Sequence, residues 1–294
     1  MGYIETESLV KKASFLRIQA RSLAEEMKTG NFRSLYRGQG IEISGVRDYI
    51  RGDDIRSIDW NVTARMGRPY VKVFEEEREL QIFIVMDTSA SMLLDCGTRL
   101  PSKYTAAANT AALIVLAAEM NACPLGAVFF DGRIHFSCKP QAGKERTMLL
   151  LTQLDKLPQQ KTQGSVLANA LIGADKILRK RSLVFVLSDF RSADWERPLI
   201  KLAQKNDLVA FRMTDDFDRA LPMLGSVVFK DVESELKMVL PTSSAKLREE
   251  WKYRNESMQW RWQETCLKHG ITPVLMNTGD DPLQLLTSVF EAKK

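Results

Sequence analysis

The sequence predicts an α/β protein in which a mostly parallel sheet is covered by helices on both faces. Two observations predict this class: short, continuous apolar runs recur along the chain, and segments with helical apolar spacing separate them. Continuous runs are typical of parallel strands, because such strands are buried on both faces. The predicted strands lie at residues 81–86, 125–130, 183–187, 208–213 and 271–276.

Helices are expected between these strands and at both ends of the chain. The first of them carries apolar residues at loosely helical spacing and stops at Gly30, which predicts an amphipathic docking helix. The pattern weakens between Asp215 and Pro241, where we expect a loop with a small hairpin. The predicted helices lie at residues 7–30, 103–120, 166–178 and 243–269, with a last helix starting near Pro282.

Residues 31–78 have a different texture from the rest of the chain. They are rich in arginine, are punctuated by glycine and form short extended segments, of which residues 70–74 are expected to be a strand leading into the main sheet. Because such a segment cannot bury a core alone, we expect it to pack as an antiparallel extension against the following domain. The predicted division is an N-terminal helix and β extension at residues 1–78 and an α/β domain at residues 79–294.

The composition narrows the class of protein further. The 294 residues are 45% apolar, and Lys plus Arg (42) exceed Asp plus Glu (37) only slightly, which does not indicate nucleic-acid binding. The four cysteines are widely separated, so we expect reduced thiols. Neither a secretory leader nor a transmembrane segment is indicated, and the expected compartment is cytoplasmic.

The most informative segment is IFIVMDTSASM, in which an apolar run ends directly at Asp87. Ser89 and Ser91 follow at alternating positions, so one face of this loop presents a carboxylate and two hydroxyls. Ligands of open α/β sheets bind at the carboxyl ends of the strands, where this loop must lie. Mg²⁺ prefers oxygen ligands, so the loop predicts a site for one divalent cation. Mg²⁺ is the expected ion, and Mn²⁺ and Ca²⁺ are the alternatives. Because hydroxyls are neutral, we expect an open position on the cation for a carboxylate from a protein partner.

Two further loops are candidates to complete this site. Ser165 stands at the start of a predicted helix, and Asp189 directly follows the run at residues 183–187. We expect Ser165 to bind the cation directly, and Asp189 to act through a bound water or by orienting its neighbours. The competing interpretation is that the serines cap helices and the aspartates accept hydrogen bonds from backbone amides. Three such loops at three strand ends together favour the metal site.

The loop DTSAS resembles the DxSxS metal-ion-dependent adhesion site of von Willebrand A domains, with Ser165 at the place usually held by Thr. The upstream segment GVRDYIRGDDIRSIDWNVTARMGRPYVKVFEEERE is similar to the signature of the bacterial domain-of-unknown-function family fifty-eight, and the likeness runs from about residue 32 to about residue 290. This resemblance implies a von Willebrand A-like (Rossmann-like) domain. It also implies an accessory protein often encoded beside MoxR-type AAA ATPases, so that a MoxR-type ATPase or its client is the implied partner.

The upstream segment is also dense in charge. We expect its arginines and carboxylates to form pairs that tie the extension to the main domain, with Trp60 packed at the junction. A dedicated partner site is the alternative. The residues concerned lie within 19 consecutive positions and are Arg47, Arg51, Asp53, Asp54, Arg56, Asp59, Trp60 and Arg65.

Two other functions are conceivable from the sequence. A metal-dependent phosphoester hydrolase could use Asp87 as its nucleophile, but such aspartyl phosphatases place a second Asp where Ser89 stands. The two histidines, His135 and His269, lie in a predicted hairpin strand and at a helix end, so neither indicates a catalytic base. No GxxxxGK[ST] phosphate loop occurs, so we do not expect nucleotide hydrolysis. Nucleic-acid binding could use the basic residues at 246–268, but glutamates interleave with them, so we expect the tryptophans there to pack inward. We therefore expect a metal-dependent protein-binding adaptor that is not an enzyme.

Overall fold

The computed structural model describes residues 9–29, 37–77, 80–94, 100–156, 166–230 and 237–291. Its centre is a sheet in the order β10-β7-β6-β3-β4-β5, in which all neighbours run parallel except the edge strand β5, which is antiparallel to β4. The predicted, mostly parallel sheet is therefore confirmed. Its strands are β3 (Ile82–Asp87), β4 (Leu125–Phe130), β5 (Ile134–Gln141), β6 (Leu183–Ser188), β7 (Asp207–Thr214) and β10 (Thr272–Asn277).

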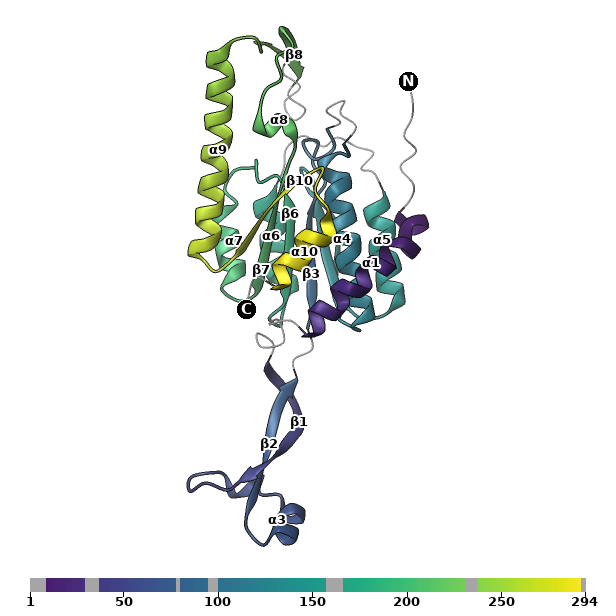
Figure 1. Ribbon diagram of the computed structural model, residues 1–294, viewed down its shortest axis with the longest axis vertical. Coiled ribbons are helices and arrows are strands. Elements are labelled where there is room, and N and C mark those ends of the chain that lie inside the picture. The colour runs from purple at the N-terminus through teal and green to yellow at the C-terminus, as the bar shows by residue number, and fades with distance from the viewer. Residues whose placement is uncertain are drawn as a thin grey trace.

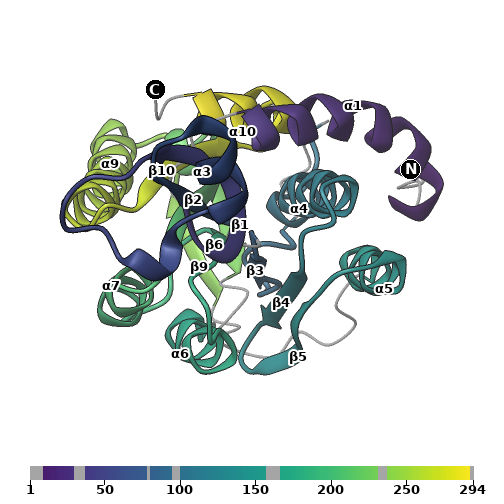
Figure 2. The same ribbon diagram turned by 90° about the horizontal axis from the view of Figure 1, so that it is seen from below.

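Helices cover both faces of this sheet, as Figure 2 shows. On one face α1 (Leu9–Thr29) lies across α4 (Lys103–Met120), α5 (Lys144–Asp155) and α10 (Pro282–Glu291). The other face carries α6 (Leu167–Ile177), α7 (Glu196–Ala203) and α9 (Ala245–Lys268). The expected docking of the N-terminal helix is confirmed.

The two faces of the sheet give the molecule two cores, and β3 serves both. Its side chains alternate, because successive residues of a strand point to opposite faces. Ile82, Ile84 and Met86 belong to the core under α4, whereas Phe83 and Val85 belong to the core under α6. All of β3 is consequently buried, which fixes the position of the loop that follows it.

The predicted antiparallel β extension and its strand at residues 70–74 are confirmed, but the extension forms an arm. The prediction that it packs against the main domain is wrong. β1 (Arg37–Asp48) and β2 (Tyr70–Glu77) form a separate antiparallel pair, with the short helices η1 (Ile55–Ser57) and α3 (Trp60–Met66) at its far end. Figure 1 shows this arm projecting from the end of the sheet at which β3 begins. Trp60, expected at a junction, is 67% exposed at the tip of the arm.

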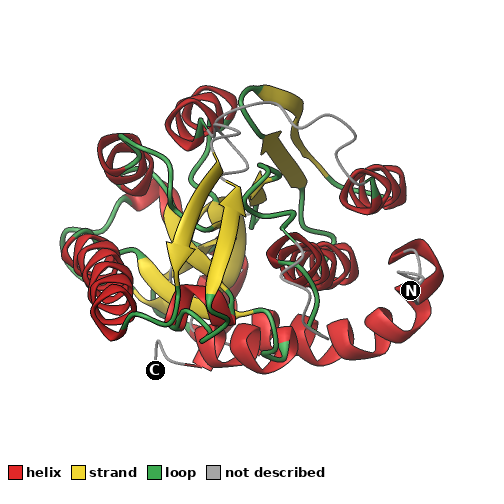
Figure 3. Ribbon diagram, turned by 90° about the horizontal axis from the view of Figure 1, so that it is seen from above, coloured by secondary structure: helices red, strands yellow, loops and turns green. Residues whose placement is uncertain are grey.

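A small hairpin lies over the opposite end of the sheet (Figure 3). It consists of β8 (Ser226–Lys230) and β9 (Lys237–Pro241) and follows the short helix α8 (Asp216–Arg219), so the predicted hairpin is confirmed. In α9, Trp262 is buried as expected, but Trp260 is 65% exposed, so the inward packing of all tryptophans is wrong. Among the described residues, no helix is long and apolar enough to span a membrane.

Candidate metal centre

The candidate site lies where β3 and β6 end side by side. The two strands are parallel neighbours, with Met86 opposite Leu187, so Asp87 and Ser188 emerge at the same edge of the sheet. Asp87 is fully buried, and both of its carboxylate oxygens accept hydrogen bonds. Oδ2 accepts from the Ser188 hydroxyl at 2.6 Å, and Oδ1 accepts from the Ser89 N–H at 2.9 Å.

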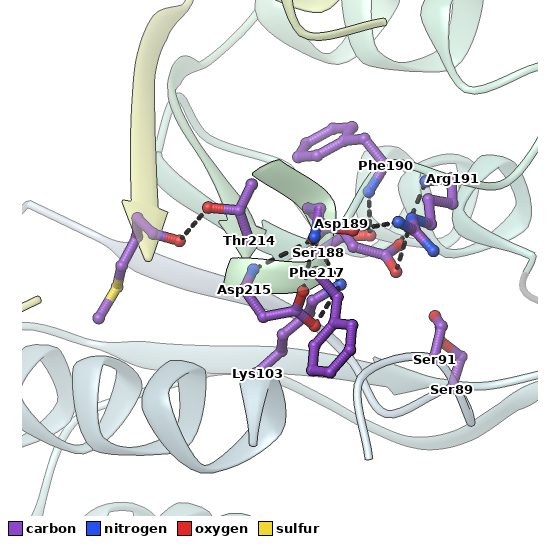
Figure 4. A network of polar contacts seen from close by, with 12 residues as sticks. Ser89, Ser91, Lys103, Ser188, Asp189, Phe190, Arg191, Thr214, Asp215 and Phe217 are labelled. Carbon is purple, nitrogen blue, oxygen red and sulfur yellow. Dashed lines mark hydrogen bonds and ion pairs between the residues drawn. The ribbon is translucent and has the colours of Figure 1, made fainter. Parts of the chain in front are cut away.

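The two serines after Asp87 bring their hydroxyls together, as the alternating spacing predicts. Ser89 and Ser91 are both buried, and their Oγ atoms are 3.2 Å apart (Figure 4). Neither serine caps the following helix, because the N-cap of α4 is Ser102, whose hydroxyl accepts from the Thr105 N–H. The helix-cap half of the competing interpretation therefore fails for these two residues. Its other half is confirmed, because Asp87 and Asp189 both accept backbone N–H groups.

Asp189 brings a second buried carboxylate to this edge. Its Oδ1 accepts from the Arg191 N–H at 3.1 Å, whereas its Oδ2 has no hydrogen-bond partner and lies 3.9 Å from Arg191 Nε. Burial raises the pKa of Asp87 to about 7, and the negative charge of Asp189 contributes to the rise. Hydrogen bonds from Ser188 and Ser89 act in the opposite direction. The site thus concentrates negative charge that the neighbouring hydroxyls do not neutralise.

The remaining predicted residue, Ser165, lies outside the described residues. One of the two histidines, in contrast, lies next to the site. His135 stands on β5, as predicted for a hairpin strand, and its Nε2 is 2.7 Å from the hydroxyl of Thr88, inside the DTSAS loop. Thr88 also donates to the carbonyl of Phe130, so this contact fixes the loop to β4 and β5.

A network of ion pairs that was not predicted adjoins the site (Figure 4). Lys103, which is almost completely buried at the start of α4, contacts Asp218 at 2.7 Å and Asp215 at 3.3 Å. Arg191 forms an ion pair with the other oxygen of Asp218, so one guanidinium lies between Asp218 and Asp189. Burial opposes ionisation of Asp218, but the charges of Lys103 and Arg191 hold its pKa below the usual value. The network joins the candidate site to α8.

The sequence did contain a signal for this network. A lysine in the first turn of a helix is disfavoured by the helix dipole, so Lys103 directly after the N-cap indicates a nearby carboxylate. Asp215, Asp216 and Asp218 cluster downstream, but their distance along the chain hides the partnership. Ser188 likewise became recognisable as the partner of Asp87 only once the register of β3 and β6 was known.

The side chains at this edge fit a hard divalent cation only if hydroxyls take part. In the part of the chain that the structure describes, no group of three or more His, Cys, Asp and Glu residues could hold a metal ion. Asp87, Ser89 and Ser91 instead supply one carboxylate and two hydroxyls, which is a donor set suited to Mg²⁺ or Mn²⁺. The buried Oδ2 of Asp189 has no hydrogen-bond donor, and a water on the cation would supply one.

Three features define a von Willebrand A-like domain. The mostly parallel sheet is covered by helices on both faces, its edge strand is antiparallel, and the DTSAS loop follows its central strand. The family model described as Protein of unknown function DUF58 matches residues 45–260. The chain belongs to this family.

The chain is also similar to other proteins of known sequence or structure. An uncharacterized protein of Mycobacterium tuberculosis, Rv1480, is 31% identical over 237 residues, which cover 79% of this chain and 74% of the relative. Among solved structures, BatB from Bacteroides thetaiotaomicron matches with 15% identity and a TM-score of 0.47 over 71% of this chain and 96% of that one. An aerotolerance-related membrane protein from Bacteroides fragilis matches with 16% identity and a TM-score of 0.49, again over 71% of this chain and 96% of that one.

Proposed function

We propose that this chain is a metal-ion-dependent protein-binding module that acts as an adaptor or accessory protein. Asp87, Ser89 and Ser91 hold one divalent cation, Mg²⁺ in the first instance, while Ser165 and Asp189 complete the site. The cation supplies an electrophilic position that a carboxylate of a partner protein fills. The resemblance to MoxR-associated proteins makes a MoxR-type AAA ATPase, or its client, the proposed partner.

One observation carries this proposal: two buried carboxylates and two buried hydroxyls meet at the carboxyl edge of the sheet with too little positive charge beside Asp87. Buried carboxylates without a cationic partner destabilise a fold, so their persistence calls for a compensating ligand. Arg191 reaches Asp189, but no basic side chain among the described residues contacts Asp87. A divalent cation satisfies this requirement.

Calorimetric titration of Mg²⁺ and Mn²⁺ into the full chain tests the metal site. Asp87→Asn keeps the shape and hydrogen-bonding oxygen of the side chain while removing its charge, so we expect binding to be lost. Asp207→Asn is the matched control, because Asp207 is a partly buried carboxylate at the opposite edge of the sheet, paired with Arg181. The proposal fails if the wild type takes up neither ion, or if Asp87→Asn binds as well as the control.

Partner docking is tested separately, by measuring binding of a purified MoxR-type ATPase from the same genome with Mg²⁺ or with a chelator. We expect association that the chelator and Asp87→Asn both weaken. If the ATPase binds equally well with the chelator and with Mg²⁺, docking does not require the metal. Metal-dependent hydrolysis of a phosphoester that disappears in Asp87→Asn would favour the hydrolase function instead.

A further inference from the structure

We propose that the tip of the arm is a second docking surface, which accepts an acidic, amphipathic segment of another protein. The tip comprises residues 45–70 and includes η1 and α3. It lies beyond the end at which β3 begins, whereas the candidate metal centre lies where β3 ends (Figure 1). This surface is therefore separate from the metal centre and does not rest on the function proposed for it.

The tip buries few of its apolar side chains. Among residues 45–72, the part of the arm whose side chains are described, Val71 is the single buried residue. Local polar contacts define the conformation instead: Asp59 accepts from the N–H groups of Asn61 and Val62 at the start of α3, and Gly67 ends that helix in the left-handed region. Several apolar side chains of the tip are exposed and available for a partner.

The exposed apolar residues of the tip lie close together in the sequence, between residues 46 and 66. Isolated exposed apolar residues are ordinary on a protein surface, but a dense group marks an interaction site. The group includes a tryptophan, the residue type that most often dominates interface energetics. Its members are Val46, Ile50, Ile55, Trp60 and Met66.

The charges of the tip indicate the kind of partner. Each of its four carboxylates has a partner within the arm: Asp53 pairs with Arg47 through two bonds of 2.7 Å, Asp48 lies 3.7 Å from Arg68, and Asp54 and Asp59 accept backbone N–H groups. No described contact engages the side chains of three exposed arginines, Arg51, Arg56 and Arg65. The tip therefore offers guanidinium groups and apolar side chains together, and a segment with acidic and apolar faces complements both.

Protein fits this surface better than a polyphosphate or an anionic membrane does. Residues 45–70 contain five arginines against four aspartates, so the net charge of the tip is only +1. A nucleic acid or an anionic bilayer would meet the interleaved carboxylates as well as the arginines. A protein segment can place its own carboxylates against the three arginines and its apolar residues against Trp60.

The test measures fluorescence anisotropy of a labelled peptide titrated with the full chain. The probe is an amphipathic helical peptide of about four turns, with Glu on its polar face and Leu and Phe on its apolar face. We expect saturable binding that Trp60→Ala weakens about tenfold and that triple replacement of Arg51, Arg56 and Arg65 by Glu abolishes. Trp260→Ala is the matched control, because Trp260 is as exposed as Trp60 but lies on α9.

Further measurements distinguish between different ligands of the tip. We expect the peptide with Lys at every Glu position, duplex DNA and anionic lipid vesicles to bind more weakly than the acidic peptide, and Asp87→Asn to bind the acidic peptide normally. The proposal is overturned if the acidic peptide does not bind, if Trp60→Ala and Trp260→Ala behave alike, or if DNA or vesicles bind more tightly. A Trp60-dependent dimer in sedimentation would identify a second copy as the occupant and would also overturn it.

Discussion

Asp87 carries an unusual free energy of ionisation, since it is fully buried and faces the charge of Asp189. Its pKa is about 7 in the folded protein against an ordinary value of 3.8. Between these values the native state retains a proton that the unfolded state has released. This contribution to stability is therefore fully present below a pH of about 4 and is lost as the pH rises towards 7.

Stability of the metal-free protein should consequently fall as the pH rises through this range. The expected loss is on the order of a few kcal/mol. Urea denaturation at several pH values, with a chelator and with Mg²⁺, measures it. Mg²⁺ should make the decline shallower, because a bound cation favours the ionised carboxylate. The same slope in Asp87→Asn as in the wild type would show that Asp87 is not its source.

Lys103 provides a second prediction at the scale of single residues. Replacing it by Met removes the cation between Asp215 and Asp218 and leaves these largely buried carboxylates with less positive charge beside them. We expect a loss of about 3–5 kcal/mol in the free energy of unfolding, measured by urea denaturation. The double variant Lys103→Met/Asp218→Asn should recover part of the loss, since it removes one of the two carboxylates that had faced the lysine.

An exposed pair supplies the control for Lys103. Lys205 is largely exposed and contacts Asp175 at 2.8 Å, so Lys205→Met should cost no more than about 1 kcal/mol. Comparable losses in Lys103→Met and Lys205→Met would contradict a special role for the buried network.

At the scale of elements, the close packing of β3, β4 and β5 can be tested at one glycine. A Cβ added to Gly126 would lie 2.8 Å from Phe83 Cδ2, 2.8 Å from the backbone nitrogen of Pro140 and 2.9 Å from the carbonyl oxygen of Cys138. Two of these neighbours are backbone atoms in a paired strand and cannot easily move. Gly126→Ala should therefore destabilise the protein by about 1–3 kcal/mol in thermal or urea unfolding.

Gly45→Ala is the matched control, because a Cβ there meets no atom within 4 Å. Gly45 lies in β1 of the arm, away from both cores. Similar melting temperatures for Gly126→Ala and Gly45→Ala would mean that β4 and β5 leave room for a methyl group at residue 126.

The strands and helices of the main sheet were predictable because each continuous apolar run corresponds to one buried strand. The helix at residues 103–120 and the strand at residues 125–130 agree with α4 and β4 at both ends. α5 was not predicted, since its run MLLL is as compatible with a strand as with a helix. The arm was misplaced because an alternation of charge and apolar residues indicates extended structure but does not say against what it packs.

The candidate site was predictable in part, and for a related reason. Asp87, Ser89 and Ser91 are close in sequence, so their convergence follows from the spacing of one loop. Contacts across the sheet, such as Ser188 with Asp87 and His135 with Thr88, depend on strand order and register. Apolar patterns within one segment do not encode that order. The division at residue 78 and the role of Ser165 remain predictions.

At the scale of the whole molecule, the arm is an insertion that could be removed without opening the cores. Arg37 and Glu77 are paired partners in the antiparallel ladder, so the two ends of the arm lie next to each other. Replacing residues 37–77 with a short Gly–Ser linker should leave the melting temperature within a few degrees of the full chain, roughly the effect of 1 kcal/mol or less. Calorimetry measures this, and loss of a cooperative transition would show that the arm supports the main domain.

The position of the arm in the chain also has a mechanical consequence. β2 ends at Glu77, and β3 begins at Ile82 and ends at Asp87. A force applied at the tip is therefore transmitted through β2 to the central strand of the sheet, and through β1 towards α1. Because β4 and β6 flank this strand, two ladders of hydrogen bonds resist its sliding in shear at the same time. Tension on the arm and a ligand at Asp87 would therefore act on opposite ends of β3, which is hydrogen-bonded to a neighbouring strand on each side.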